Sequence, residues 1–167
     1  SKGSCSRKEI RKFLQELLAE NSKKRSEVKK CLVPSNNCYS SKAFEISEYT
    51  DFYSCKNHAL NASKIIRGEN AELKKNWYNL PVAYNGRASS IVITDSDIRR
   101  PTGQIYEQAN GIVKFEPTKK LDFELEMGTV IGGSLSIGDT LDFEEAENLI
   151  FGYVLLNDWS ARDIQAW

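Results

Sequence analysis

Residues 121–127 alternate strictly between apolar and acidic side chains. A period of two is that of a β-strand, which puts the apolar side chains on one face and the carboxylates on the other. The carboxylates belong to Asp122, Glu124 and Glu126. Side chains on one face of a strand are only about 7 Å apart, so three like charges in a row repel each other unless a cation intervenes. Two interpretations follow: a solvated outer face of an antiparallel strand, or a site for a hard cation such as Mg²⁺ or Ca²⁺.

The length and charge of the chain exclude several other classes of protein. Its 167 residues are enough for a domain with a core, and 23 basic side chains are balanced by 23 acidic ones. With no net charge, we expect neither nucleic acid nor a membrane as a partner. The apolar runs are far too short to span a bilayer, and the first residues do not have the pattern of a signal peptide. We therefore expect a cytoplasmic protein.

Residues 1–49 are predicted to form an N-terminal helix and a linker. Ser6-Arg7-Lys8-Glu9 has the form of a capping box, and apolar residues follow at helical spacing from Ile10 to Leu18. The segment 34–49 is mostly polar and aperiodic, which is typical of a loop. The functional part is therefore expected in residues 50–167.

A second helix is predicted from Thr50 to about Ile66, with Gly68 shortly after its end. It would place Asp51 and His58 two turns apart on roughly one side. His58 is the only histidine of the chain. Most single histidines are structural or exposed, but an imidazole is also the natural general base for activating water.

Three further elements are predicted. Residues 88–94 are rich in Ile and Val and indicate a strand, and a short acidic helix is expected after Thr140 or Asp142. Residues 151–156 form a nearly continuous apolar run, which predicts a buried strand.

Asp158 follows this third element directly. A charge at the end of a buried strand is costly unless a metal or a basic side chain compensates it. The structural alternative is that Asp158 caps a helix and pairs with Arg162, four residues further on.

Four segments together resemble the fumarylacetoacetases in order and spacing. They are Asp-Phe-Tyr-Ser-Cys-Lys-Asn-His at 51–58, Leu-Pro-Val-Ala-Tyr-Asn-Gly-Arg-Ala-Ser-Ser at 80–90, the alternating segment 121–127, and Asn-Asp-Trp-Ser-Ala-Arg-Asp-Ile-Gln at 157–165. The resemblance covers roughly residues 33–167 and favours the fumarylacetoacetases over their shorter relatives. It implies an α+β, β-rich fold, in which residues 50–167 form part of the mixed β-sandwich roll of that family's C-terminal domain, preceded here by the N-terminal helix.

The resemblance also implies a reaction and a set of site residues. The reaction is hydrolysis of a carbon–carbon bond in a β-diketo acid, giving fumarate and acetoacetate in tyrosine breakdown. The implied ligands of a Ca²⁺ or Mg²⁺ ion are Asp51, Glu124, Glu126 and Asp158, which leaves Asp122 outside the coordination shell. His58 resembles the base that activates water, and Arg162 with Gln165 resembles the donors that stabilise the oxyanion and the departing carbanion. The implied substrate contacts are Tyr53, Arg67, Tyr84 and Gln165, and the family implies a homodimer.

Departures from the family pattern leave other interpretations open. Asn57 and Asn85 stand where glutamine and histidine are expected, and residues 1–49 are too few for the family's β-rich N-terminal domain. The family also continues beyond the position of Trp167, with a lysine and a threonine at a second Mg²⁺ site and an acidic residue that orients the histidine. We therefore expect either a partial chain of an enzyme that is inactive by itself, or a non-catalytic binding or dimerising module. A related oxo-acid hydrolase or decarboxylase is a third alternative.

Overall fold

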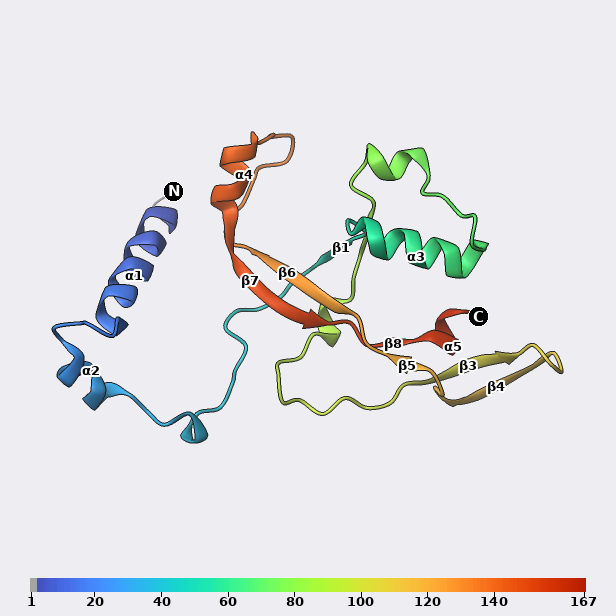
Figure 1. Ribbon diagram of the computed structural model, residues 1–167, viewed down its shortest axis with the longest axis horizontal. Coiled ribbons are helices and arrows are strands. Elements are labelled where there is room, and N and C mark those ends of the chain that lie inside the picture. The colour runs from blue at the N-terminus through green and yellow to red at the C-terminus, as the bar shows by residue number, and fades with distance from the viewer. Residues whose placement is uncertain (1–2) are drawn as a thin grey trace. The chain divides into compact units, whose positions relative to one another are not determined.

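The computed structural model describes residues 3–167, with the backbone alone for residues 3–5 and 66. The chain forms two compact units, one of Ser35–Asp97 and one of Ser1–Pro34 with Ile98–Trp167. Helices and antiparallel strand pairs both occur along the chain, which confirms the α+β class (Figure 1). None of the helices within the described residues is long and apolar enough to cross a membrane.

A short strand pair and a helix organise the unit of residues 35–97. Strand β1 (Thr50–Phe52) pairs antiparallel with β2 (Ala83–Asn85), and helix α3 (Lys56–Arg67) follows β1. The predicted helix start at Thr50 was therefore wrong. Thr, Phe and Tyr favour extended backbone, and here the extended backbone of β1 pairs with β2. The predicted end is confirmed, because Gly68 takes a φ of 99° and its N–H donates to the carbonyl of Lys64.

The strand predicted for residues 88–94 was also wrong. The chain there forms the short 3₁₀ turn η3 (Ala88–Ser90), in which the Ser90 hydroxyl donates to the carbonyl of Arg87 at 2.9 Å. Serine competes for nearby backbone groups in this way, so the segment is satisfied locally without a partner strand. Two further 3₁₀ turns in this unit are η1 (Ser35–Asn37) and η2 (Lys75–Tyr78).

The other unit contains a β-hairpin that the sequence analysis missed. Strands β3 (Thr102–Glu107) and β4 (Ile112–Pro117) pair antiparallel, and Gly111 in the connecting loop has a φ of 69°. Asn-Gly between two extended segments is a hairpin signal, since glycine adopts a positive φ without strain.

A longer antiparallel ribbon carries the acidic segment. Strand β5 (Leu121–Asp122) pairs with β8 (Ser160–Ala161), and β6 (Leu125–Ile131) pairs with β7 (Ile150–Asn157). The register is the same in both halves, so the intervening Glu124 falls opposite Asp158, and the Asp158 N–H donates to the Glu124 carbonyl at 3.0 Å. The predicted strand 121–127 is thus interrupted at residues 123 and 124 without changing which side chains share a face.

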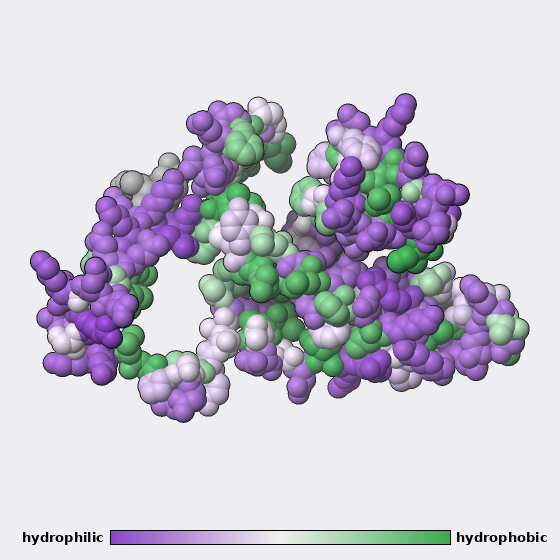
Figure 2. Space-filling view, in the orientation of Figure 1, coloured by the Kyte–Doolittle hydropathy of each residue, from purple (hydrophilic) through white to green (hydrophobic). Residues whose placement is uncertain are grey.

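The two faces of this ribbon differ from the predicted burial. Phe123, Leu125 and Met127 are between 62% and 72% exposed, whereas Glu124 and Glu126 on the opposite face are half-buried. The predicted strand at 151–156 is confirmed as part of β7, but its predicted burial was wrong, since Leu155 is 78% exposed. Hydrophobic side chains lie at the surface over β6 and β7 (Figure 2). Within the described residues, these side chains are therefore largely open to solvent.

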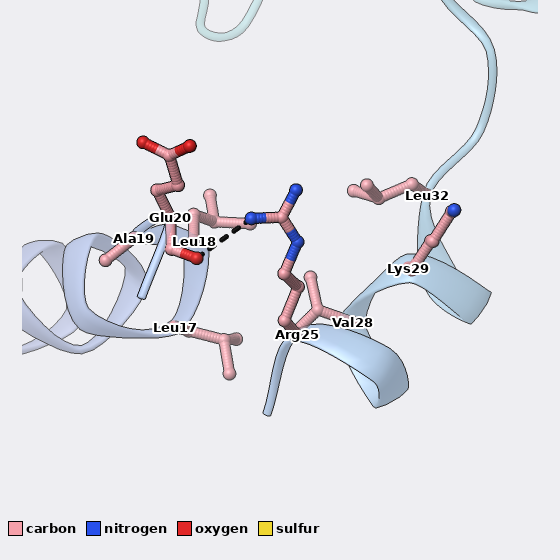
Figure 3. Close-up of a pocket in the computed structure, with 8 residues that line it drawn as sticks. All are labelled: Leu17, Leu18, Ala19, Glu20, Arg25, Val28, Lys29 and Leu32. Atoms are coloured by element: carbon pink, nitrogen blue, oxygen red, sulfur yellow. Dashed lines mark hydrogen bonds between the residues drawn. The ribbon is translucent and has the colours of Figure 1, made fainter. Parts of the chain in front are cut away.

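The predicted N-terminal helix is present as α1 (Gly3–Leu18), and α2 (Arg25–Cys31) follows it. The capping box predicted at Ser6 was wrong, because Ser6 lies inside α1. Leu17, Val28 and Leu32 line an open groove between them, and the Arg25 guanidinium donates to the Glu20 carbonyl (Figure 3). The acidic helix is confirmed as α4 (Phe143–Leu149), which Asp142 begins with a capping box. The last helix is the short α5 (Arg162–Gln165).

Candidate metal centre

The acidic face of the long ribbon brings together three of the predicted metal ligands. Glu124 and Glu126 are two residues apart on one strand and therefore share a face, and the register puts Asp158 on that face from the other strand. A carboxylate oxygen of Glu126 and one of Asp158 lie within 4.8 Å of each other. All three residues are half-buried. The three carboxylates thus share one face at one end of the β6–β7 pair.

Arg162 supplies the positive charge that this face needs. Its Nη2 atom lies 2.9 Å from Asp122 Oδ2 and 2.7 Å from Glu124 Oε1, and its Nε donates to Asp122 Oδ2 at 2.9 Å. These partners come from the opposite strand, and helical spacing alone did not predict them. Partial burial alone would lower the pKa of Arg162, but hydrogen bonds to the two carboxylates raise it overall. The guanidinium therefore remains charged.

Ser160 and the backbone of Arg162 add hydrogen bonds between the two strands of the ribbon. Ser160 lies opposite Asp122, and its hydroxyl donates to Glu124 Oε1 at 3.1 Å. The Arg162 N–H donates to the Lys120 carbonyl at 2.9 Å, which extends the ladder by one bond beyond β8. The small Ser160 side chain leaves room for the long side chain of Arg162 to reach across the strand pair.

The donor set fits a hard divalent cation. Glu124, Glu126 and Asp158 offer only carboxylate oxygens, the ligands that Ca²⁺ and Mg²⁺ prefer. Arg162 cancels part of the negative charge, and the remaining charge is still negative. The arrangement suits Ca²⁺ or Mg²⁺ and contains none of the soft ligands typical of zinc.

The fourth predicted ligand, Asp51, lies on β1 in the other unit and is half-buried. Tyr84 lies directly opposite on β2, and its hydroxyl donates to Asp51 Oδ2 at 2.7 Å. This bond between a predicted ligand and a predicted substrate contact follows from the strand register. This hydrogen bond was not predicted, because the sequence pattern indicated a helix at Asp51.

His58 lies in the first turn of α3 and is exposed. The Tyr53 ring meets the His58 ring edge to face, with 5.5 Å between centroids and 84° between planes. The Tyr53 hydroxyl donates to the Ala59 carbonyl at 3.2 Å, and Trp77 Nε1 donates to the Tyr53 carbonyl at 2.7 Å. Tyr53 is thus held at both its side chain and its backbone, and its ring limits the positions that His58 can adopt.

The two remaining predicted site residues lie at helix ends. Arg67 is the last residue of α3 and is exposed. Gln165 ends α5, and its Oε1 accepts a hydrogen bond from Arg162 Nη1 at 3.0 Å. Gln165 and Arg162 therefore form one hydrogen-bonded pair.

Comparison with known proteins identifies the family. Residues 48–167 match the family model described as Fumarylacetoacetate (FAA) hydrolase C-terminal. The fumarylacetoacetase of Arabidopsis thaliana is 52% identical over 122 residues, which are 73% of this chain and 29% of the relative. The fumarylacetoacetase of Oryza sativa subsp. japonica is 45% identical over 139 residues, 83% of this chain and 32% of the relative.

The similarity also reaches the N-terminal helices. The fumarylacetoacetase of Bos taurus is 41% identical over 169 residues, which cover 99% of this chain and 40% of the relative. The match therefore extends beyond the residues 33–167 that the motifs indicated. The chain spans between 29% and 40% of the length of these three relatives. With the four motifs and the acidic ribbon inside the matched region, the chain belongs to the fumarylacetoacetate hydrolase family.

Proposed function

We propose that the protein carrying this sequence hydrolyses a carbon–carbon bond in a β-diketo acid, with fumarylacetoacetate as its substrate. The observation that carries this proposal is the half-buried acidic face of Glu124, Glu126 and Asp158, which lies within the region matched by the family. The relatives are named fumarylacetoacetases, and their identity to this chain reaches 52%. Fumarate and acetoacetate are the products that this assignment predicts.

The metal ligands in this proposal are Asp51, Glu124, Glu126 and Asp158. A Ca²⁺ or Mg²⁺ ion bound there supplies Lewis-acid polarisation of a substrate carbonyl. The support is the oxygen-only donor set and the resemblance of segments 51–58, 121–127 and 157–165 to the family.

His58 takes a proton from the attacking water in this proposal. An imidazole ring accepts a proton readily at neutral pH, and the Tyr53 ring restricts its orientation. Arg162 and Gln165 donate hydrogen bonds to the oxyanion that forms and to the carbanion that departs as acetoacetate. Fixed donors of this kind stabilise the negative charge that develops in the transition state, because they need no reorganisation during the reaction.

Tyr53, Arg67 and Tyr84 are the proposed substrate contacts. A dicarboxylate-like substrate needs a fixed cation, and the guanidinium of Arg67 can bind a carboxylate through two hydrogen bonds. By the family resemblance we also propose that the whole protein is a cytoplasmic homodimer.

The test uses the natural protein that carries this sequence, purified and treated with EDTA. Loss of the diketone absorbance of fumarylacetoacetate is followed before and after adding Ca²⁺ or Mg²⁺. We expect turnover only with the cation, and fumarate among the products. Cation binding without turnover would favour the non-catalytic alternative, and release of CO₂ from an oxo-acid would favour the decarboxylase.

A further inference from the structure

We propose that Asp122 is a positioning residue that holds Arg162 and shares its charge, so that Glu124 remains available to a divalent cation. The inference rests on the proposed function and deepens it, because the family resemblance gives Asp122 no role. The carboxylate of Asp122 lies on the same face of the ribbon as those of Glu124 and Glu126.

The geometry of the guanidinium carries the argument. Asp122 receives two contacts from Arg162, one from Nε and one from Nη2, each of 2.9 Å. Glu124 receives one contact, of 2.7 Å, from the same Nη2. The planar guanidinium is therefore fixed mainly by Asp122, and Glu124 contacts only one edge of it.

The strand register explains why Asp122 can do this. Asp122 lies opposite Ser160, and Arg162 follows two residues later on the same face, so its side chain crosses diagonally to Asp122. The hydroxyl of Ser160 donates to Glu124 Oε1, the same atom that contacts Arg162. Both contacts use Oε1, which leaves Oε2 as the atom that we assign to the cation.

Removal of the Asp122 charge would change how the Arg162 guanidinium is shared between Asp122 and Glu124. Arg162 would then keep its contact with Glu124 without the competing Asp122 carboxylate, and a cation would have to compete with the guanidinium for Glu124. We therefore expect Asp122→Asn to weaken Ca²⁺ binding through Arg162, in addition to the small direct effect of one lost charge. The side chain of Asp122 is 48% exposed, so the direct effect is screened at about 0.15 M salt.

A double-mutant cycle separates these two effects. The Kd for Ca²⁺ is measured by calorimetry for the wild type, Asp122→Asn, Arg162→Gln and the double variant, at about 0.15 M salt. We expect Asp122→Asn to raise the Kd about tenfold, at the lower end of the effect of residues that support metal ligands. In the Arg162→Gln background the same change should raise it threefold at most. Asp122→Glu, which retains the charge, should restore most of the affinity.

Glu107→Gln is the matched control. This variant also loses one ion-paired carboxylate, because Glu107 contacts Lys114 at 2.6 Å, but Glu107 lies on the β3–β4 hairpin. The Kd of the variant for Ca²⁺ should stay within twofold of the wild-type value. An equal effect of Asp122→Asn in both Arg162 backgrounds would overturn the inference, because Asp122 would then act only as a charge.

Nuclear magnetic resonance on the unmodified sequence avoids any folding defect of the variants. The Arg162 Nε–H signal, assigned by its loss in Arg162→Lys, should persist when Ca²⁺ is added, because Asp122 holds it throughout. Its disappearance on Ca²⁺ addition would overturn the inference. Absence of Ca²⁺ and Mg²⁺ binding in the wild type would overturn the proposed function and this inference together, whereas wild-type binding with an unchanged Asp122→Asn variant would overturn this inference alone.

Discussion

Glu126 and Asp158 illustrate how single residues acquire a role at this site. They are 32 positions apart in the sequence, yet their carboxylate oxygens lie within 4.8 Å because two antiparallel strands pair in one register. Repulsion between two such charges favours any state in which a cation lies between them. Glu126, His58 and Asp163 each give a prediction at the scale of a single side chain.

Glu126→Gln is expected to weaken Ca²⁺ and Mg²⁺ binding by at least tenfold, because an amide oxygen replaces a charged ligand. Calorimetry measures the change. Glu144→Gln on α4 removes one exposed carboxylate elsewhere in the same unit and serves as the control. Unchanged affinity in the Glu126 variant would show that the acidic face is only solvated.

His58→Ala is expected to lower the turnover of fumarylacetoacetate by orders of magnitude in the natural protein, with little change in Ca²⁺ affinity. The reason is that a base acts on water and need not bind the metal. Asn57→Ala, at the neighbouring exposed position on α3, is the control. Equal activity of the His58 variant would identify a structural histidine.

Asp163 gives a prediction for pH. Desolvation would raise the pKa of Asp163, but hydrogen bonds from the Thr118 hydroxyl and the Lys119 N–H outweigh it and lower the pKa overall. A lowered pKa in the folded state stabilises the fold fully above the unfolded-state pKa, about 3.9, and this stabilisation is lost as the pH falls through the lower folded value. The melting temperature should therefore fall less between pH 5 and pH 2 in Asp163→Asn than in the wild type. An equal fall in melting temperature between pH 5 and pH 2 in the two proteins would contradict this prediction.

At the scale of elements, local signals that lie within one helix or turn were sufficient to predict structure. The capping box of α4 is one case, since the Asp142 side chain accepts from the Glu145 N–H at 2.8 Å and Glu145 Oε2 accepts from the Asp142 N–H at 3.1 Å. The strand predicted at 88–94 failed because β-propensity needs a partner strand, and Ser90 bonds to the backbone of Arg87 instead.

The α4 cap can be tested without global unfolding. Asp142→Ala should cost about 1 kcal/mol of local helix stability, which corresponds to about a fivefold faster amide hydrogen exchange at Glu145. Glu147→Ala, inside the same helix, removes a charge without removing the cap and should have a smaller effect. Equal exchange in Asp142→Ala and wild type would exclude a contribution from the cap.

At the scale of the molecule, the described chain leaves much apolar surface in contact with solvent. Leu125, Met127 and Leu155 lie on one face of the β6–β7 ribbon and are between 69% and 78% exposed. A face of this kind is usually covered by another layer of protein. The opposite, acidic face is the less exposed one.

Residues 1–167 expressed alone should therefore bind an apolar dye such as ANS strongly. The double variant Leu125→Lys, Met127→Lys should bind less dye, because both side chains contribute to the exposed face. A matched pair on the hairpin, Gln104→Lys and Gln108→Lys, adds the same two positive charges at exposed positions without removing apolar surface and should bind as the wild type does. Weak dye fluorescence in the unmodified chain would show that this face is covered.

The sequence by itself determined what depends on short-range pattern. The period of two in residues 121–127 assigned each carboxylate to its face, the helical spacing of apolar residues predicted α1, the Asp142 cap predicted α4, and four motifs identified the family. These predictions succeeded because strand periodicity and helix caps involve only residues a few positions apart.

Tertiary structure alone decided which distant residues meet. The pairing of Arg162 with Asp122, the placement of Asp51 opposite Tyr84, and the exposure of the apolar face depend on strand register and on which layers pack together. A one-residue change of register would move the side chains of one strand to the opposite face relative to its partner. The contacts that make this acidic face a candidate metal site therefore arise from the pairing of β5 and β6 with β8 and β7.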